Sequence, residues 1–183
     1  MISAEKFLNP ARELGFNFYT GTPCSYLKPF INYVIDTDGF DFYDSVNEGD
    51  AVAIAAGATV AGKRAVVMFQ NSGLGNAVNP LTSLTYTFNL PVMVITTLRG
   101  EPGGAADEPQ HELMGQITIA MLETMKLKWA YFPQTEEEVI PALSAADEYM
   151  KKNNQPFVFV MRKDDISDYK LQKKAAPSKK DFS

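Results

Sequence analysis

The chain has 183 residues, 45% of them hydrophobic, which suits a single domain that can bury a sizeable core without disulfides. Its single cysteine excludes an internal disulfide and fits a reducing compartment. The formal net charge is −5, and residues 162–183 form a short basic segment, so the residues before it are more acidic than the whole chain. This acidic body argues against broad nucleic-acid binding.

The first residues, MISAEKFLNPAREL, lack the long apolar core of a secretory signal. No apolar run reaches the roughly 20 residues that a membrane-spanning helix needs. We therefore expect a cytoplasmic protein that binds neither membranes nor nucleic acids.

In chain order, the first expected helix has apolar side chains at helical spacing, Phe7, Leu8 and Ala11, behind a candidate N-cap at Ser3. Gly15 ends this helix, since glycine favours the position after a helix. Short apolar or aromatic segments predict six strands, at residues 16–20, 40–45, 65–69, 91–97, 129–132 and 157–161. The segments between the strands have helical patterns, at residues 26–35, 48–62, 80–87, 111–125 and 135–150.

Two polar segments interrupt this alternation. The Gly/Asn-rich residues 70–79 indicate a loop that leads into the next helix, and residues 98–110 indicate a longer loop. Loops of that length in a compact domain are usually functional or disordered. In the last helix, Thr135 and Glu138 predict a capping box, and Pro141 is a candidate kink.

Six alternations of strand and helix predict an α/β fold with three layers, a six-stranded parallel sheet with helices on both faces and right-handed crossovers. We assign residues 1–165 to this domain and residues 166–183 to a charged C-terminal tail.

The stretch VNEGDAVAIAAGATVAG, residues 46–62, predicts a helix of mostly small apolar residues with a carboxylate, Glu48, at its start. Because apolar residues fill both sides, we expect this helix to be buried all round. A desolvated Glu48 would tend to hold a proton and work as a hydrogen-bond donor or acid/base group. The alternative is that Glu48 is an N-terminal helix residue favoured by the helix dipole.

Ligands of parallel sheets bind outside the carboxyl ends of the strands. The loops after the first four strands all lie at that edge, and they carry polar residues that can converge there. These residues are Cys24, Ser25, Glu48, Asn71, Ser72, Arg99 and His111.

Several readings of these residues stay open. GLGNAV at residues 73–78 looks like a dinucleotide fingerprint but has Val78 in place of the third glycine, which leaves a nucleotide-dependent oxidoreductase a weak hypothesis. Cys24 and His111 are either a nucleophile and its base or a small buried hydrophobe and a structural histidine.

Arg99 either binds an oxyanion or pairs with Glu101 or Glu108 to brace its loop. One histidine and one cysteine make a structural zinc site improbable, and we predict no metal ligands in this chain.

Four segments together, GTPCSYLKPF, VNEGDAVAIAAGATVAG, QNSGLGNAVNPLTSL and RGEPGGAADEPQHELMGQIT, resemble the phosphonopyruvate decarboxylase family of thiamine diphosphate enzymes. Sulfopyruvate decarboxylases are near relatives. The resemblance runs over about residues 4–162 and covers only the pyrimidine-binding half of such an enzyme. It implies an α subunit that converts 3-phosphonopyruvate to phosphonoacetaldehyde and carbon dioxide in phosphonate biosynthesis, as in antibiotic pathways.

The same resemblance implies thiamine diphosphate as cofactor, with Mg²⁺ and the diphosphate held mainly by a β subunit in an α2β2 or larger assembly. A truncated single-chain enzyme is the alternative to a split one. A sulfopyruvate decarboxylase α subunit and a non-catalytic assembly subunit are the alternative functions.

The resemblance also implies roles for individual residues. Glu48 would face the aminopyrimidine ring and exchange a proton with a ring nitrogen, and Cys24 stands where the family often has an aspartate proton donor. The implied catalytic residues are Glu48, Cys24 and His111. The implied cofactor contacts are Glu48, Asn71, Ser72, Gly73 and Leu74, and the implied substrate contacts are Ser25, Asn71, Ser72, Arg99 and His111.

Overall fold

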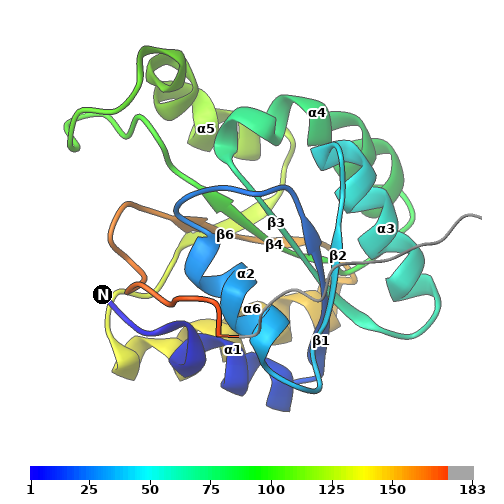
Figure 1. Cartoon of the computed structure of the whole chain (residues 1–183). Helices are drawn as coiled ribbons and strands as arrows, with labels where there is room; N and C mark the ends of the chain where they lie inside the picture. The colour runs from blue at the N-terminus through cyan, green and yellow to red at the C-terminus, as the bar shows by residue number, and fades with distance from the viewer. Residues whose placement is uncertain (173–183) are drawn as a thin grey trace, which may run out of the picture.

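A computed structural model describes residues 1–172 and shows a six-stranded sheet in the order β2-β1-β3-β4-β6-β5 (Figure 1). Every pair of neighbouring strands is parallel, which confirms the predicted α/β fold. The strands are β1 (Phe16–Gly21), β2 (Asp41–Asp44), β3 (Arg64–Phe69), β4 (Met93–Thr97), β5 (Lys128–Tyr131) and β6 (Phe157–Met161).

Helices cover both faces of the sheet (Figure 1). One face carries α1 (Ala4–Glu13), α2 (Lys28–Asp36) and α6 (Glu136–Asn153). The other carries α3 (Glu48–Val60), α4 (Leu74–Asn79) and α5 (Glu112–Thr124), with short helical segments η1 (Asn71–Gly73), η2 (Pro80–Tyr86) and η3 (Pro109–His111).

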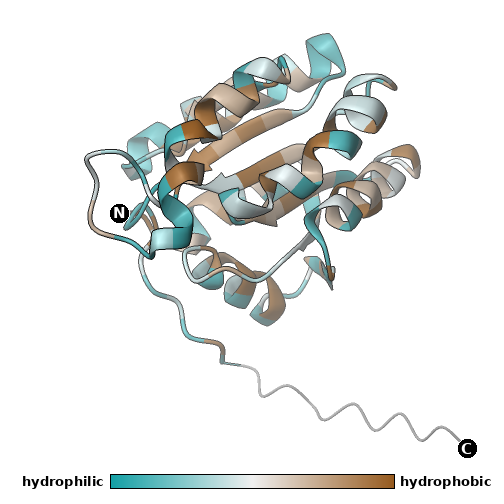
Figure 2. Ribbon diagram, turned by 90° about the horizontal axis from the view of Figure 1, so that it is seen from above, coloured by the Kyte–Doolittle hydropathy of each residue, from teal (hydrophilic) through white to brown (hydrophobic). Residues whose placement is uncertain are grey.

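The central strands are buried on both faces, as their continuous apolar sequences predict. In β3, Val66 and Met68 belong to the hydrophobic cluster beneath α1, α2 and α6, whereas Val67 and Phe69 belong to the cluster beneath α3, α4 and α5. Figure 2 shows these strands as a hydrophobic layer between the helices. This rigid centre supports the loops at its carboxyl edge.

The expectation that the Glu48 helix is buried all round is wrong for this chain. Only one side of α3 lies on the sheet, through residues such as Val52 and Ala55. The other side is open: Ile54 is 38% exposed and Val60 is 73% exposed. A helix with apolar residues on every side therefore has one apolar side without a partner in the described part of the chain.

The predicted loop at residues 70–79 is also wrong, because the chain turns directly into the helical segments η1 and α4. The following segment η2 is a π-helix that begins at Pro80, a residue without a backbone N–H to continue the α-helical ladder. Helix thus begins close behind β3 and brings Gly73 and Asn76 to the edge of the sheet.

The predicted capping box of Thr135 and Glu138 is present at the start of α6, and Pro141 lies inside that helix. The Ser3 side chain, in contrast, makes no capping hydrogen bond.

The first residues of the predicted tail lie against the domain. Ile166 pairs with Ile2, and the Asn32 amide donates to the backbone oxygen of Tyr169 at 2.8 Å. The rest of the predicted tail, residues 173–183, lies outside the described residues. The boundary at residue 165 therefore stays a prediction.

One buried carboxylate ties α6 to β3 and makes stability depend on pH. Asp147 is 6% exposed and forms ion pairs with Arg64 at 2.6 Å and Lys151 at 2.7 Å. Burial raises the pKa of Asp147, but the Lys151 and Arg64 contacts outweigh it and the net pKa is lowered. The stabilisation is therefore present above the ordinary carboxyl pKa near 3.9 and is lost as the pH falls below it.

We expect Asp147→Asn to lower the free energy of unfolding by about 1–3 kcal/mol near pH 7, because Arg64 then lacks a charged acceptor. Urea unfolding at several pH values measures this, and the difference from wild type should shrink below pH 4. Glu148→Gln, at the exposed neighbouring carboxylate, is the control and should cost less than about 0.5 kcal/mol. An equal loss in both variants would contradict the ion-pair account.

Candidate active site

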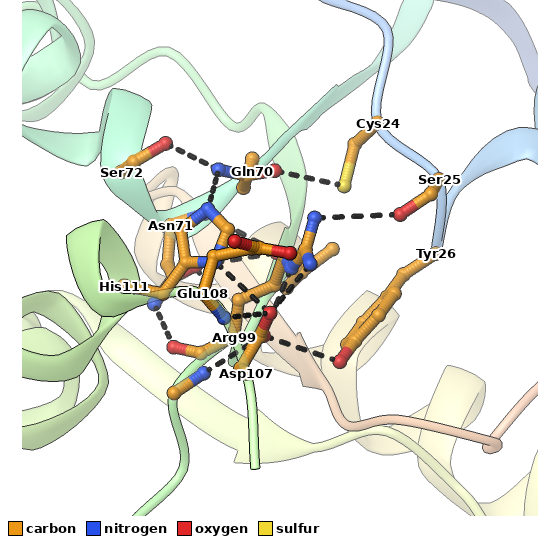
Figure 3. A network of polar contacts seen from close by, with 12 residues as sticks. Cys24, Ser25, Tyr26, Gln70, Asn71, Ser72, Arg99, Asp107, Glu108 and His111 are labelled. Atoms are coloured by element: carbon orange, nitrogen blue, oxygen red, sulfur yellow. Dashed lines mark hydrogen bonds and ion pairs between the residues drawn. The ribbon is translucent and has the colours of Figure 1, made fainter.

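The predicted polar residues meet at the carboxyl edge of the sheet in two adjacent groups. One group surrounds Glu48 at the start of α3. The other is a hydrogen-bonded network that contains six of the predicted residues and is drawn in Figure 3. Its predicted members are Cys24, Ser25, Asn71, Ser72, Arg99 and His111.

The Glu48 carboxylate is held from both sides. Thr22 donates its hydroxyl to Oε1 at 3.0 Å, and Asn76 donates its amide to Oε2 at 2.8 Å. The Glu48 side chain is half-buried, so the complete desolvation that we expected is not found in this chain. Glu48 also lies in the first turn of α3, where the helix dipole favours a negative charge. A role as an acid/base group and a role as an N-terminal helix residue are therefore compatible.

Gly73 makes room for this carboxylate. A Cβ atom at Gly73 would lie closer than 3.0 Å to the carboxyl carbon of Glu48. The position therefore requires glycine for the Glu48 side chain to lie where it does. Of the predicted cofactor contacts, Gly73 lies directly against Glu48, whereas Leu74, the first residue of α4, is buried in the hydrophobic core.

Asp107, which sequence reasoning missed, lies at the centre of the network. Its carboxylate accepts hydrogen bonds from Arg99 Nε at 3.0 Å and Arg99 Nη2 at 2.5 Å, and it lies 3.1 Å from His111 Nδ1. The backbone N–H of Glu108 donates to it at 2.8 Å. The Arg99 guanidinium holds the pKa of Asp107 well below its usual range. The partner of Arg99 is thus Asp107, not Glu101 or Glu108 as the sequence suggested.

Arg99 also borders Tyr26 and Ser25. The guanidinium lies 5.1 Å from the ring centre of Tyr26, and its Nη1 lies 3.5 Å from the Ser25 hydroxyl. The Tyr26 hydroxyl faces Asp107 at 3.5 Å; burial, and then the charge of Asp107, raises the pKa of Tyr26. Asp107 and Tyr26 therefore orient the Arg99 guanidinium, and its Nη1 group points toward the loop that carries Ser25.

Gln70 separates the cysteine from the histidine. The Cys24 thiol faces Gln70 Oε1 at 3.5 Å, while Gln70 Nε2 lies 2.6 Å from the Ser72 hydroxyl and 3.1 Å from His111 Nε2 (Figure 3). Among the described residues no hydrogen bond joins Cys24 to His111. The structure therefore does not form the nucleophile and base pair considered above.

Asn71 of η1 is completely buried and is hydrogen-bonded both to the loop after β4 and to α5. Its amide donates to the backbone oxygen of Arg99 and to the Thr118 hydroxyl, each at 3.0 Å, and its side-chain oxygen accepts from the Arg99 N–H at 3.2 Å. Both donor hydrogens are used in this way. The Asn71 side chain therefore holds Arg99 in place.

The loop between β4 and α5 is fixed at its base and open at its tip. Gly100 has a φ of +72°, and a Cβ atom at Gly115 of α5 would overlap the Gly100 carbonyl. Beyond this contact, residues 101–109 line a cleft of about 440 Å³. Only glycine at both positions allows the loop to lie this close to α5.

Residues 1–172 contain no group of three His, Cys, Asp or Glu side chains placed to hold a metal ion. Within the same part of the chain, no helix has the length and apolar character to cross a membrane.

A carboxylate at a helix start, beside an arginine and histidine joined by an aspartate, lies at the carboxyl edge of a parallel sheet. This arrangement defines an α/β enzyme domain whose ligand site borders the edge of the sheet. The chain belongs to the family described as thiamine pyrophosphate enzyme, N-terminal TPP binding domain, whose model matches residues 4–122. The resemblance seen in the sequence is thereby confirmed.

Three curated relatives narrow the comparison. A phosphonopyruvate decarboxylase of Streptomyces viridochromogenes is 39% identical over 97% of this chain, and one of Streptomyces hygroscopicus is 37% identical over 98%. This chain spans 45% and 44% of those proteins, which is about half their length. A sulfopyruvate decarboxylase subunit alpha of Methanocaldococcus jannaschii is 30% identical over 81% of this chain and 86% of that protein.

Solved structures support the fold. A thiamin diphosphate-dependent enzyme from Mycobacterium smegmatis, described as putative, matches 96% of this chain and 33% of its own, with a TM-score of 0.67 and 24% identity. Benzoylformate decarboxylase from Polynucleobacter necessarius matches 96% of this chain and 33% of its own, with a TM-score of 0.70 and 22% identity. At these identities the likeness concerns the fold alone.

Proposed function

We propose that this chain is the α subunit of a thiamine diphosphate-dependent decarboxylase that converts 3-phosphonopyruvate to phosphonoacetaldehyde and carbon dioxide. The observation that carries the proposal is the Glu48 carboxylate, held by Thr22 and Asn76 at the sheet edge and given space by Gly73. The identity to phosphonopyruvate decarboxylases supports the substrate, and phosphonate biosynthesis is the corresponding pathway.

The residues present fit the pyrimidine end of this cofactor. A carboxyl group suits a ring nitrogen that must exchange a proton, and the half-buried Glu48 lies beside a glycine that adds no bulk. When bound, thiamine diphosphate supplies the carbon nucleophile and the electron sink for decarboxylation. Glu48 would move the proton at the pyrimidine ring, with Thr22 and Asn76 fixing the carboxylate's direction.

The network beside Glu48 would receive the substrate. Arg99 and Ser25 offer a guanidinium and a hydroxyl to an anionic 2-oxo acid, and Ser72 lies nearby in η1. His111 is the proposed proton carrier. Cys24 lies one residue before Ser25 and stands where relatives with an aspartate would have a stronger acid, since a thiol has an ordinary pKa near 8.5.

We assign Mg²⁺ and the cofactor diphosphate to a β subunit in an α2β2 or larger assembly. The open apolar side of α3 supports a partner at this place, because Ile54 and Val60 are exposed there and Val46, just before the helix, is 97% exposed. The match to most of a subunit named alpha supports the same division of the enzyme.

A sulfopyruvate decarboxylase α subunit is the second candidate function. The relatives named sulfopyruvate decarboxylase subunit alpha favour it, because this chain covers 86% of one of them and 95% of another.

Coexpression with a β subunit tests the proposal. The expected result is a complex that copurifies, requires thiamine diphosphate, and releases aldehyde from phosphonopyruvate with a higher kcat/KM than from sulfopyruvate. A higher kcat/KM for sulfopyruvate would select the second candidate. A β subunit that turns over equally well without this chain would reduce the chain to an assembly subunit.

A further inference from the structure

Four side chains form a continuous row at the edge of the sheet: Asp107, His111, Gln70 and Cys24 (Figure 3). The row joins two loops and the end of β3. The side chains of Asp107 and His111 are 9% and 6% exposed, and Cys24 is 8% exposed. Each contact pairs one donor with one acceptor, so the position of one hydrogen decides the others.

Asp107 determines which atom carries the hydrogen in its contact with His111. Arg99 donates to the carboxylate through Nε and Nη2, and the backbone N–H groups of Glu108 and Gly100 donate to it as well. An ionised carboxylate has no hydrogen to give. The facing nitrogen of His111, Nδ1, must therefore carry the proton of the 3.1 Å contact.

The other ring nitrogen then has a lone pair. His111 Nε2 lies 3.1 Å from the amide nitrogen of Gln70, which has hydrogens to donate, and the second of these faces the Ser72 hydroxyl at 2.6 Å. With its NH₂ group turned this way, Gln70 presents its oxygen to the Cys24 thiol. The thiol completes the row as a donor.

We propose that Asp107 is a positioning residue that holds the neutral His111 ring with its proton on Nδ1 and so sets the direction of the hydrogen bonds through Gln70 to Cys24. The proposal deepens the proposed function, on which its catalytic meaning rests. When substrate displaces the Gln70 amide, the Nε2 lone pair of His111 can accept the proton of a hydroxyl group on the reacting species. That oxygen keeps the O–H electron pair, and the Asp107 carboxylate stabilises the imidazolium that forms. The Cys24 thiol donates to the Gln70 amide oxygen that faces it.

The single histidine makes a direct test possible. The full chain is produced without a histidine tag, labelled with nitrogen-15 histidine, and studied by NMR at about pH 8, above the ordinary imidazole pKa. For the assembled enzyme, unlabelled partner subunit keeps all signals assigned to His111. We expect a neutral ring with the proton on Nδ1, whereas a proton on Nε2, or on both nitrogens, would overturn the proposal.

Asp107→Ala should release the row. His111 Nδ1, Arg99 Nη2 and the Glu108 N–H all face Oδ1 of Asp107, so an asparagine oxygen would still serve all three, whereas alanine removes this acceptor. The proton is then no longer held on Nδ1, and NMR should show a larger share of the Nε2 tautomer. An unchanged tautomer in Asp107→Ala would overturn the assignment of Asp107.

Glu108→Gln is the matched control, because it removes an exposed carboxylate next in sequence and should leave the Nδ1 proton in place. Asp107→Glu, which keeps a carboxylate, should restore the wild-type tautomer. If Asp107→Ala does not fold, the wild-type spectrum and the Asp107→Glu variant still decide the question.

In the assembled enzyme, Asp107→Ala should lower kcat by about 10²-fold or more, with Glu108→Gln close to wild type. The NMR result needs neither cofactor nor substrate. A failure of the proposed function therefore shows in the activity assay alone, and a failure of this inference shows in the spectra.

Discussion

Glu48→Gln is expected to lower kcat of the assembled enzyme by about 10²–10⁴-fold while the chain remains folded, the range typical of losing a general acid or base. The amide keeps the size of the side chain and can still accept from Thr22 or Asn76, which now hold Oε1 and Oε2. It cannot exchange a proton with a heterocycle. Aldehyde release from phosphonopyruvate, measured at saturating thiamine diphosphate, gives kcat.

Asp50→Asn provides the matched control for this substitution. Asp50 is an exposed carboxylate in the same first turn of α3, so its loss removes a similar helix-dipole contribution, about 0.3–1 kcal/mol. We expect near wild-type kcat for this variant and an unchanged circular dichroism spectrum for both. If Glu48→Gln were as active as Asp50→Asn, Glu48 would be only a helix N-terminal residue.

The sheet was predictable because its sequence signals are local. β3, β4 and β6 are runs of apolar residues bounded by turns, and strands buried on both faces require nothing else. Glu48 was found in the same way, since a carboxylate at the start of an otherwise apolar helix is visible without any contact information.

The partners of the site residues depend on contacts that sequence patterns do not encode. Asp107 becomes the centre of the network only because the loop returns to α5, where Gly100 and Gly115 allow a close approach. One signal was available: Asp107 stands four residues before the only histidine. Gln70 was taken as part of a turn, although it follows directly after β3 and thus projects at the ligand edge.

The exposed side of α3 illustrates a second limit. Apolar composition shows that a side chain avoids water, but it does not show whether the sheet or another chain covers it. Val52 meets the sheet and Val60 does not, although both are valines of one helix. The prediction that the helix is buried all round is wrong because it treated every apolar residue of the helix as covered by this chain's own sheet.

Gly73→Ala is expected to give a folded but nearly inactive protein, with kcat lowered by about 10²-fold or more because the Glu48 carboxylate is displaced. The new methyl group would lie closer than 3.0 Å to the end of the Glu48 side chain. That side chain is flexible, so it swings away from Thr22 and Asn76 at little cost. The backbone of Gly73 has a φ of −81° and a ψ of −7°, which alanine adopts freely.

The free energy of unfolding should therefore fall by no more than about 2 kcal/mol, because the gain of about 0.4–1 kcal/mol from replacing glycine by alanine partly offsets the loss of the two hydrogen bonds to Glu48. Gly75→Ala is the control, because no atom lies within 4 Å of a Cβ atom at that exposed position. Urea unfolding together with kcat separates the two variants. Activity equal to that of Gly75→Ala would show that Glu48 does not need the space that this glycine leaves, and the placement of the carboxylate would lose its support. A loss of more than about 3 kcal/mol would contradict the expectation that the Glu48 side chain moves away from the new methyl group.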